Sequence, residues 1–278
     1  MARPLRNRTA LQIVVGIVVL GVAAAVVLAA VQIGHRSGAS GPRQTQQPAA
    51  TINASEAVGA VPASVFDSVG IGTTKVAPAK IDAPKLTADG KPQVIYVGGE
   101  FCPYCAAERW SLAVALARFG SFDGLGVTYS APAPEVYPGT ATLSFHGASF
   151  TSDYLSLSAS EIYDRDHKKL DTLSSHDQRV FDKYDAAPYT QSSGSIPFID
   201  FGGGRIIAGA QYDPGVLKGE SQAQIAAALK DPSSPIAQAV IGSANVLTVG
   251  LCEQTGEQPA SVCQSKGVQT AAAAMKAN

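Results

Sequence analysis

Cys102-Pro103-Tyr104-Cys105 stands between an apolar run at residues 92–97 and a long apolar stretch at residues 106–119. The first run predicts a short buried strand, and the second predicts a helix with little interruption. Proline is favoured at the first helical position, which places the first cysteine at the N-cap and the second in the first turn. The sequence therefore predicts two cysteines at the N-terminus of a helix, directly after a strand.

This position favours reversible thiol chemistry. Backbone N–H groups and the positive end of the helix dipole favour the thiolate of Cys102, which is the form that attacks a disulfide. The two-residue spacer lets the two sulfurs meet, so Cys105 can resolve a mixed disulfide formed at Cys102. We therefore predict Cys102 as the nucleophile and Cys105 as the resolving thiol.

The other two cysteines, Cys252 and Cys263, lie in the C-terminal part of the chain. A four-cysteine zinc site usually brings two closely spaced pairs, and this wide spacing without a nearby histidine fits such a site poorly. We expect a structural disulfide between Cys252 and Cys263, with a redox relay to the first pair as the less favoured alternative. A disulfide needs an oxidising compartment. We predict no metal site, and we interpret the scattered histidines as ordinary surface or core residues: His35, His146, His167 and His176.

An apolar run at residues 11–33, with Gln12 and Gln32 as its only polar side chains, predicts a membrane anchor. At about 1.5 Å rise per residue it covers about 34 Å, which matches a hydrocarbon core of about 30 Å. Arginines in residues 1–10 keep that segment cytoplasmic by the positive-inside rule, so everything after the run is exported. A cleaved signal peptide is the alternative, but the run is longer than a usual signal h-region.

The remaining composition predicts an exported globular part behind a flexible tether. The chain is 46% hydrophobic and 15% charged with a net charge of −1, and no basic patch indicates a nucleic-acid partner. Residues 34–54 are rich in Gly, Ser, Gln, Pro and Ala and predict the linker. Residues 55–278 are long enough for one substantial core.

Between the first helix and the next recognisable motif, the pattern is less regular. Residues 125–130 predict a second strand, which gives a strand–helix–strand unit with parallel neighbouring strands. We interpret residues 132–188 as an insertion that shapes the substrate face. It contains short strand-like runs and a predicted helix at residues 176–187.

A hairpin and a helical end follow. A strand at residues 195–201, a three-glycine turn at residues 202–204 and a returning strand at residues 205–208 predict the hairpin. A helix at residues 215–230 comes next. A C-terminal helical extension over residues 235–278 carries the second cysteine pair.

A strand, a Cys-Pro-x-Cys helix and, much later, Ile196-Pro197 entering an antiparallel hairpin together resemble the thioredoxin superfamily. The resemblance implies an α/β fold with a thioredoxin-like mixed sheet flanked by helices, and it places the insertion between the second strand and the hairpin. It also implies that the bond before Pro197 is cis, that this proline lies beside the cysteines, and that Ile196 hydrogen-bonds the substrate backbone. A plain strand-edge proline is the alternative.

More closely, residues 99–110, with the sequence Gly-Glu-Phe-Cys-Pro-Tyr-Cys-Ala-Ala-Glu-Arg-Trp, resemble the signature of a bacterial and archaeal membrane-anchored family of unknown function. This resemblance covers most of the exported region. Tyr104 stands where strongly oxidising DsbA-type members carry histidine, and the Pro-Tyr dipeptide is similar to that of glutaredoxins. The resemblance therefore implies a potential nearer the glutaredoxin range of about −200 to −230 mV than the DsbA value of about −120 mV.

Side chains near the pair have predicted roles of their own. Glu108 could hold or accept the proton of the resolving thiol, although our preferred interpretation is a solvated first-turn glutamate. Many thioredoxins carry a buried acid in the preceding strand, where this chain has Tyr96, so proton handling must differ or use water. We interpret Arg109 and Trp110 as packing and surface residues.

Three residues form the predicted substrate face: Phe101, Tyr104 and Ile196. Phe101 resembles the aromatic residue that precedes the first cysteine in thioredoxins and contributes to this face there.

These observations predict a membrane-anchored, extracytoplasmic thiol–disulfide oxidoreductase. Its catalytic residues are Cys102, Cys105 and Pro197, its substrates are exported cysteine-containing proteins, and a membrane redox partner resets the pair. The chemistry requires no cofactor. The alternatives are a module that binds or delivers a soft metal such as Cu(I) through the two cysteines, and a non-catalytic interaction domain in which they form a structural disulfide.

Overall fold

The structure of the chain is a computed structural model that describes residues 52–277. The predicted cytoplasmic segment, the predicted anchor at residues 11–33 and most of the predicted linker lie outside the described residues. The described part is a mixed α/β structure with one main sheet. Its strands are β1 (Ala79–Lys80), β2 (Thr87–Ala88), β3 (Lys91–Gly98), β8 (Ser156–Glu161), β9 (Phe198–Phe201) and β10 (Arg205–Ala208).

Strand β3 is the centre of this sheet and leads directly to the cysteine pair. It runs antiparallel to β9, with Val97 opposite Phe198, and parallel to β8, with Gly98 opposite Glu161. On the far side of β9, β10 and then the short β1 complete the sheet, and β2 pairs with the start of β3. The end of β3 is therefore enclosed on both sides.

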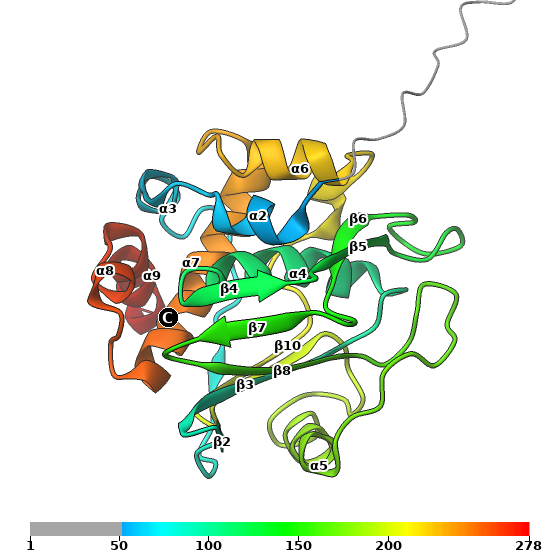
Figure 1. The fold of residues 1–278 in the computed structure, drawn as a ribbon, viewed down its shortest axis with the longest axis horizontal. Helices are drawn as coiled ribbons and strands as arrows, with labels where there is room; N and C mark the ends of the chain where they lie inside the picture. Colours follow the sequence, from blue (N-terminus) through cyan, green and yellow to red (C-terminus); the bar gives the residue numbers. More distant parts are fainter. Residues whose placement is uncertain (1–51, 278) are drawn as a thin grey trace, which may run out of the picture. The chain divides into compact units, whose positions relative to one another are not determined.

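Alternation along β3 distributes its side chains to two separate cores. Val94 and Tyr96 pack in the larger core with helices α4 (Pro103–Leu116) and α7 (Pro235–Thr255). Ile95 and Val97 face the opposite way and pack with α5 (Ser175–Tyr184) in a smaller core. Successive side chains of a strand point to opposite faces, so the sheet is covered by helices on both sides (Figure 1).

The parallel partner of β3 differs from the predicted one. The predicted strand at residues 125–130 is β5 (Gly126–Tyr129), which pairs antiparallel with β6 (Ala141–Ser144) outside the main sheet. A second small ribbon joins β4 (Gly120–Asp123) to β7 (Ser149–Ser152). The strand parallel to β3 is β8, which lies within residues 132–188.

The predicted insertion therefore includes a strand of the main sheet, β8, as well as β6 and β7 of the two small ribbons. The physical reason is that alternation predicts that a strand exists but carries no information about its partner. The sequence of β8 is also mostly polar, since the strand pairs only with β3 and most of its length is half-buried.

The predicted hairpin is present as β9 and β10. Its turn needs glycine, since Gly202 and Gly203 both have positive φ, and a Cβ at Gly203 would lie 2.2 Å from the Pro84 carbonyl oxygen. The single helix predicted at residues 215–230 is instead a 3₁₀ turn η1 (Pro214–Leu217) followed by α6 (Gln222–Ala228). Gly219 has positive φ between them and Ser221 begins the second with a capping box, so the two cannot be continuous.

Helices also pack at the two ends of the described chain: α2 (Ala54–Gly59), α3 (Ala63–Val69), α8 (Ala260–Cys263) and α9 (Lys266–Ala277). The long apolar α7 is the one described helix with the length and hydropathy to cross a membrane, and 89% of that apolar window is buried within the fold. Its last turn carries Cys252, which forms a disulfide with Cys263 at the end of α8, with a Cα–Cα distance of 5.7 Å.

Replacing Cys252 and Cys263 together with alanine should lower the free energy of unfolding by about 2–4 kcal/mol, because the loop closed by the disulfide gains freedom in the unfolded chain. Denaturant titration measures this change. The variant should still react at Cys102 as the wild type does. Loss of that reactivity in a folded variant would support a relay between the two pairs.

Candidate functional site

Cys102 is the N-cap of α4, as the sequence predicted. Its backbone is extended (φ −78°, ψ 121°), and its Sγ accepts a hydrogen bond from the backbone N–H of Cys105 at 3.2 Å. Pro103 occupies the first turn. The turn between β3 and α4 is held by hydrogen bonds from Cys102 N to Gly99 O and from Ala131 N to Phe101 O. A sulfur is thereby fixed against the positive end of a 14-residue helix.

The Ile196–Pro197 bond is cis and lies beside this sulfur. The Cys102 Sγ is 3.8 Å from the carbonyl oxygen of Ile196, across 94 residues of sequence. Three other X–Pro bonds among the described residues are also cis, so the cis geometry does not single out Pro197. The contact with Cys102 does. Just before it, the buried Asp185 accepts a hydrogen bond from Ser195 N and holds the loop that leads to Ile196.

The two thiols differ in exposure and in acidity. Cys102 is 6% exposed and Cys105 is fully buried. The hydrogen bond from the Cys105 thiol, together with the Cys105 backbone N–H and the charge of Arg109, lowers the pKa of Cys102 despite its burial. Burial, followed by the interaction with Cys102, raises the pKa of Cys105 well above its ordinary value. The pair is therefore asymmetric: Cys102 is the slightly more exposed and more acidic thiol, and Cys105 is the fully buried and less acidic one.

The predicted substrate-face residues surround Cys102 but differ in exposure. The ring of Phe101 packs on His167, with ring centroids 4.2 Å apart, and edge-on against Tyr163. His167, interpreted as an ordinary residue, therefore contacts the ring of the residue that precedes Cys102. Tyr104 is 43% exposed and contacts Tyr137 edge-on.

Beside Tyr104 lies an open groove of about 850 Å³. Its walls come from residues 73–76, from Tyr104 on α4, from Tyr137, from the loop after β10 and from the start of α7. They include the side chains of Tyr212, Pro214, Val216 and Ala239.

Glu108 is fully buried, so the preferred interpretation of a solvated glutamate was wrong. Its Oε2 accepts a hydrogen bond from Gln211 N at 3.1 Å, and its Oε1 has no partner among the described residues. Burial raises the pKa of Glu108 to about 8. The physical reason for the error is that the helix has no solvated face, because α7, β6, η1 and α2 all pack against it.

Arg109 is also fully buried and forms an ion pair that the sequence did not reveal. Its Nε lies 2.9 Å from Glu161 Oε1 and 3.2 Å from the hydroxyl of Tyr96, to which it donates. Its terminal nitrogens donate to Gly99 O, Leu143 O and Thr142 Oγ1. An arginine inside an otherwise apolar helix was the available signal, because arginine is almost never fully buried unless it is paired. Trp110 is buried as predicted for a packing residue and donates to Ala141 O.

The family described as "Domain of unknown function (DUF929)" matches residues 77–253. The chain belongs to this family. No curated protein and no solved structure matches the chain. The DUF929 segment contains both cysteines of the motif, the Ile196–Pro197 bond and the Arg109–Glu161 pair. The description of the family names no reaction.

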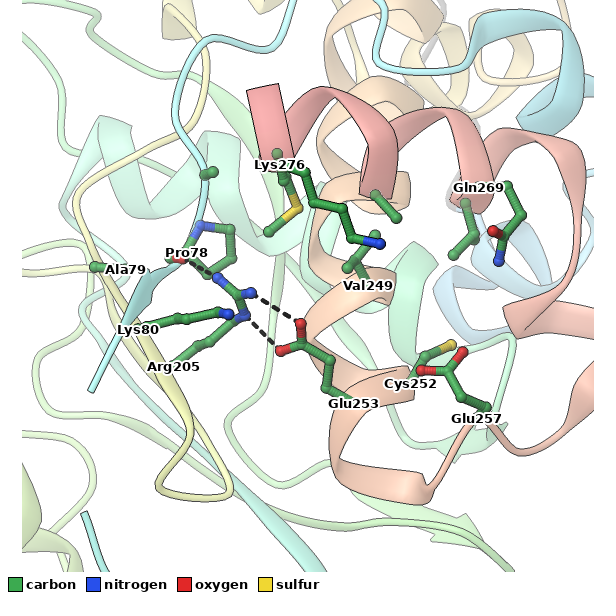
Figure 2. Close-up of a pocket in the computed structure, with 14 residues that line it drawn as sticks. Pro78, Ala79, Lys80, Arg205, Val249, Cys252, Glu253, Glu257, Gln269 and Lys276 are labelled. Carbon is green, nitrogen blue, oxygen red and sulfur yellow. Dashed lines mark hydrogen bonds and ion pairs between the residues drawn. The ribbon is translucent and has the colours of Figure 1, made fainter. Parts of the chain in front are cut away.

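A second hollow, of about 870 Å³, lies at the end of the DUF929 segment (Figure 2). Its arginine is fully engaged, because Arg205 makes two hydrogen bonds to Glu253 and a third to Pro78 O. The Glu257 carboxylate lies within 4.8 Å of both Cys252 and Cys263 sulfurs. Because these sulfurs are bonded to each other, they are not free to bind a metal.

We expect alkylation of the reduced pair to modify Cys102 before Cys105, because the thiolate is the reacting form. At a pH below the ordinary thiol pKa, the labelling rate of Cys102 should exceed that of Cys105 by about tenfold or more. Mass spectrometry of the labelled peptides measures the ratio. Cys105→Ser keeps a hydroxyl donor and should preserve the low pKa of Cys102 better than Cys105→Ala does. Preferential labelling of Cys105 would reverse the assigned roles.

Glu108 should make stability depend on pH. In the unfolded chain it ionises near its ordinary value of 4.5, whereas the folded chain holds the proton to about 8. Stability from this group is therefore full below about pH 4.5 and is lost as the pH rises towards 8. Glu108→Gln should remove that loss and gain on the order of a few kcal/mol at pH 8 over the wild type.

Denaturant titrations across this pH range test the effect, with Glu56→Gln as the exposed control. An unchanged pH dependence in Glu108→Gln would show that this carboxyl ionises normally in the folded protein.

Proposed function

We propose that this chain is a membrane-anchored, extracytoplasmic thiol–disulfide oxidoreductase with a thioredoxin-like fold. The observation that carries the proposal is the Cys102 sulfur at the N-cap of α4, 3.8 Å from the carbonyl oxygen of the residue before cis-Pro197. In this proposal the thiol of Cys102 is the nucleophile, and the neighbouring backbone carbonyl of Ile196 accepts a hydrogen bond from an extended substrate segment.

The arrangement of elements supports the thioredoxin-like assignment. A strand leads into the helix that carries the cysteines, a crossover returns the chain to a parallel strand, and a hairpin entered through Pro197 pairs antiparallel with the first strand. Helix α7 then packs against the cysteine-bearing helix α4. The two ribbons before β8 are additions to this plan.

The chemistry follows from the asymmetry of the thiols. The Cys102 thiolate attacks a substrate disulfide, its Sγ forms a bond to one substrate sulfur, and the other substrate sulfur leaves as a thiolate. The Cys105 thiol then loses its proton and attacks Cys102 Sγ, which closes the Cys102–Cys105 disulfide and releases the second substrate thiolate. The reverse sequence transfers the disulfide to a substrate dithiol. No step needs a prosthetic group.

Substrates are exported proteins with accessible cysteines. The carbonyl of Ile196, the ring of Phe101 and the half-exposed ring of Tyr104 supply backbone and side-chain contacts around the reacting sulfur. Anchoring by residues 11–33 keeps the domain beside the membrane, where a membrane redox partner resets the pair.

Single serine substitutions separate the two cysteines. Cys102→Ser should abolish disulfide exchange, whereas Cys105→Ser should leave Cys102 without its resolving thiol and accumulate mixed disulfides with exported proteins. Non-reducing gels followed by mass spectrometry of the trapped species measure this in cells. The matched control is Cys105→Ser combined with Cys102→Ser, which should trap nothing.

Two outcomes would contradict the proposal. A Cu(I) carrier would bind the metal through the reduced pair and give no trapped species. A purely structural disulfide would show a potential below about −300 mV and no exchange.

A further inference from the structure

A buried cluster of ionisable side chains lies directly beneath the cysteine pair. Arg109 is one helical turn after Cys105 on α4, and residues four apart on a helix share a face. Its guanidinium is held on the other side by Glu161, at the end of β8, and by the hydroxyl of Tyr96 on β3. All four side chains are fully buried. The sheet therefore holds a positive charge under the resolving thiol.

The contacts of Arg109 fix both its position and its charge. One terminal nitrogen donates to Gly99 O at 2.7 Å, in the turn from which Cys102 begins the helix. Burial acts to lower the pKa of Arg109, but Glu161, Tyr96 and Cys105 raise it above the ordinary value, so the guanidinium stays charged.

The negative groups that face Arg109 are few. Burial raises the pKa of Glu161 despite the ion pair, and the nearby carboxylates of Glu100 and Asp171 raise it further. Burial also raises the pKa of Tyr96, so its hydroxyl stays neutral. Glu108 belongs to a different environment, because the hydrogen bond to its carboxylate comes from Gln211 and the partners of Arg109 do not include it.

An asymmetric effect on the redox equilibrium follows. In the disulfide form neither sulfur is charged, and Arg109 has no sulfur anion to stabilise. In the dithiol form a thiolate exists, and the guanidinium lowers the pKa of both Cys102 and Cys105. Stabilising the reduced form of a pair makes the pair more oxidising.

We propose that Arg109, held by Glu161 and Tyr96, is a positioning residue that stabilises the reduced pair and makes this protein a donor of disulfides to exported proteins. The inference rests on the proposed function and adds the direction of electron flow.

Disulfide donation takes two exchange reactions. A substrate thiolate attacks Cys102 Sγ, the Cys102–Cys105 bond breaks, and Cys105 leaves as a thiolate beside Arg109. The second substrate thiolate then attacks the substrate sulfur of the mixed disulfide and releases Cys102 as a thiolate. Two electrons pass from substrate to protein. The two substrate thiols release two protons, of which one ends on Cys105 and one in solvent. Return to the disulfide form needs a two-electron acceptor, such as a quinone-linked membrane oxidase.

The test uses the full-length protein in detergent, equilibrated with reduced and oxidised glutathione, with the state of the Cys102–Cys105 peptide read by alkylation and mass spectrometry. Arg109→Met should shift the equilibrium towards the disulfide by about tenfold, which is about 30 mV more reducing, and should raise the pKa of Cys102. Arg109→Lys keeps the charge and should lie nearer the wild type.

The Glu161→Gln variant separates an electrostatic effect of Arg109 on the redox equilibrium from an effect of structural damage. It leaves the guanidinium without its counter-charge and should shift the equilibrium the opposite way, towards the dithiol. If Arg109→Met fails to fold, the direction of the Glu161→Gln shift alone decides the proposal.

The matched control is Arg118→Met. Arg118 is a partly buried arginine just beyond the other end of α4, about 20 Å along the helix from Cys105. Its guanidinium donates hydrogen bonds to the side chains of Asn245, Thr248 and Ser265. Its removal should lower stability without moving the redox equilibrium.

An unchanged equilibrium in Arg109→Met, or shifts of the same sign in Arg109→Met and Glu161→Gln, would overturn the inference while leaving exchange by the wild type intact. A wild type that does not equilibrate with glutathione would overturn the proposed function and the disulfide-donor role together. In that case, an ultraviolet titration of the thiolates in the wild type and in Arg109→Met still measures whether Arg109 lowers the pKa of Cys102.

Discussion

The burial of helix α4 is the constraint on which the chemistry of this protein depends. Every residue from Cys105 to Leu116 is buried, so each polar group on the helix must find a partner or remain uncharged. The three ionisable groups solve this in different ways: Cys105 keeps its proton, Glu108 has a pKa raised to about 8, and Arg109 is paired. The same burial brings these groups into a medium of low dielectric constant, where each charge acts strongly on its neighbours.

The parts of the site that depend on local sequence were predictable. The N-cap position of Cys102 follows from Pro103 and from the end of the apolar strand, and the three-glycine turn follows from its flanking strands. The contact between Ile196 and Cys102 was predicted through resemblance, because no local pattern relates positions so far apart. The cis bond before Pro197 was predicted in the same way.

The parts that depend on long-range pairing were not predictable. Nothing in the sequence indicates that Glu161 contacts Arg109, because this contact requires β8, rather than β5, to be the parallel neighbour of β3. A buried ion pair is not by itself a source of stability, since the cost of removing both charges from water offsets their attraction. Its position under the thiols is therefore more informative than its strength.

Trp110 gives the molecule a built-in optical probe. It is the only tryptophan in the chain, and it lies fully buried in the helix that carries the cysteines, with its indole N–H bonded to Ala141 O. Intrinsic emission from tryptophan therefore arises at one place, five residues after Cys105. A change in its wavelength or intensity reports on the packing around this one side chain, where α4 meets β6, so spectroscopy can follow that contact without any attached label.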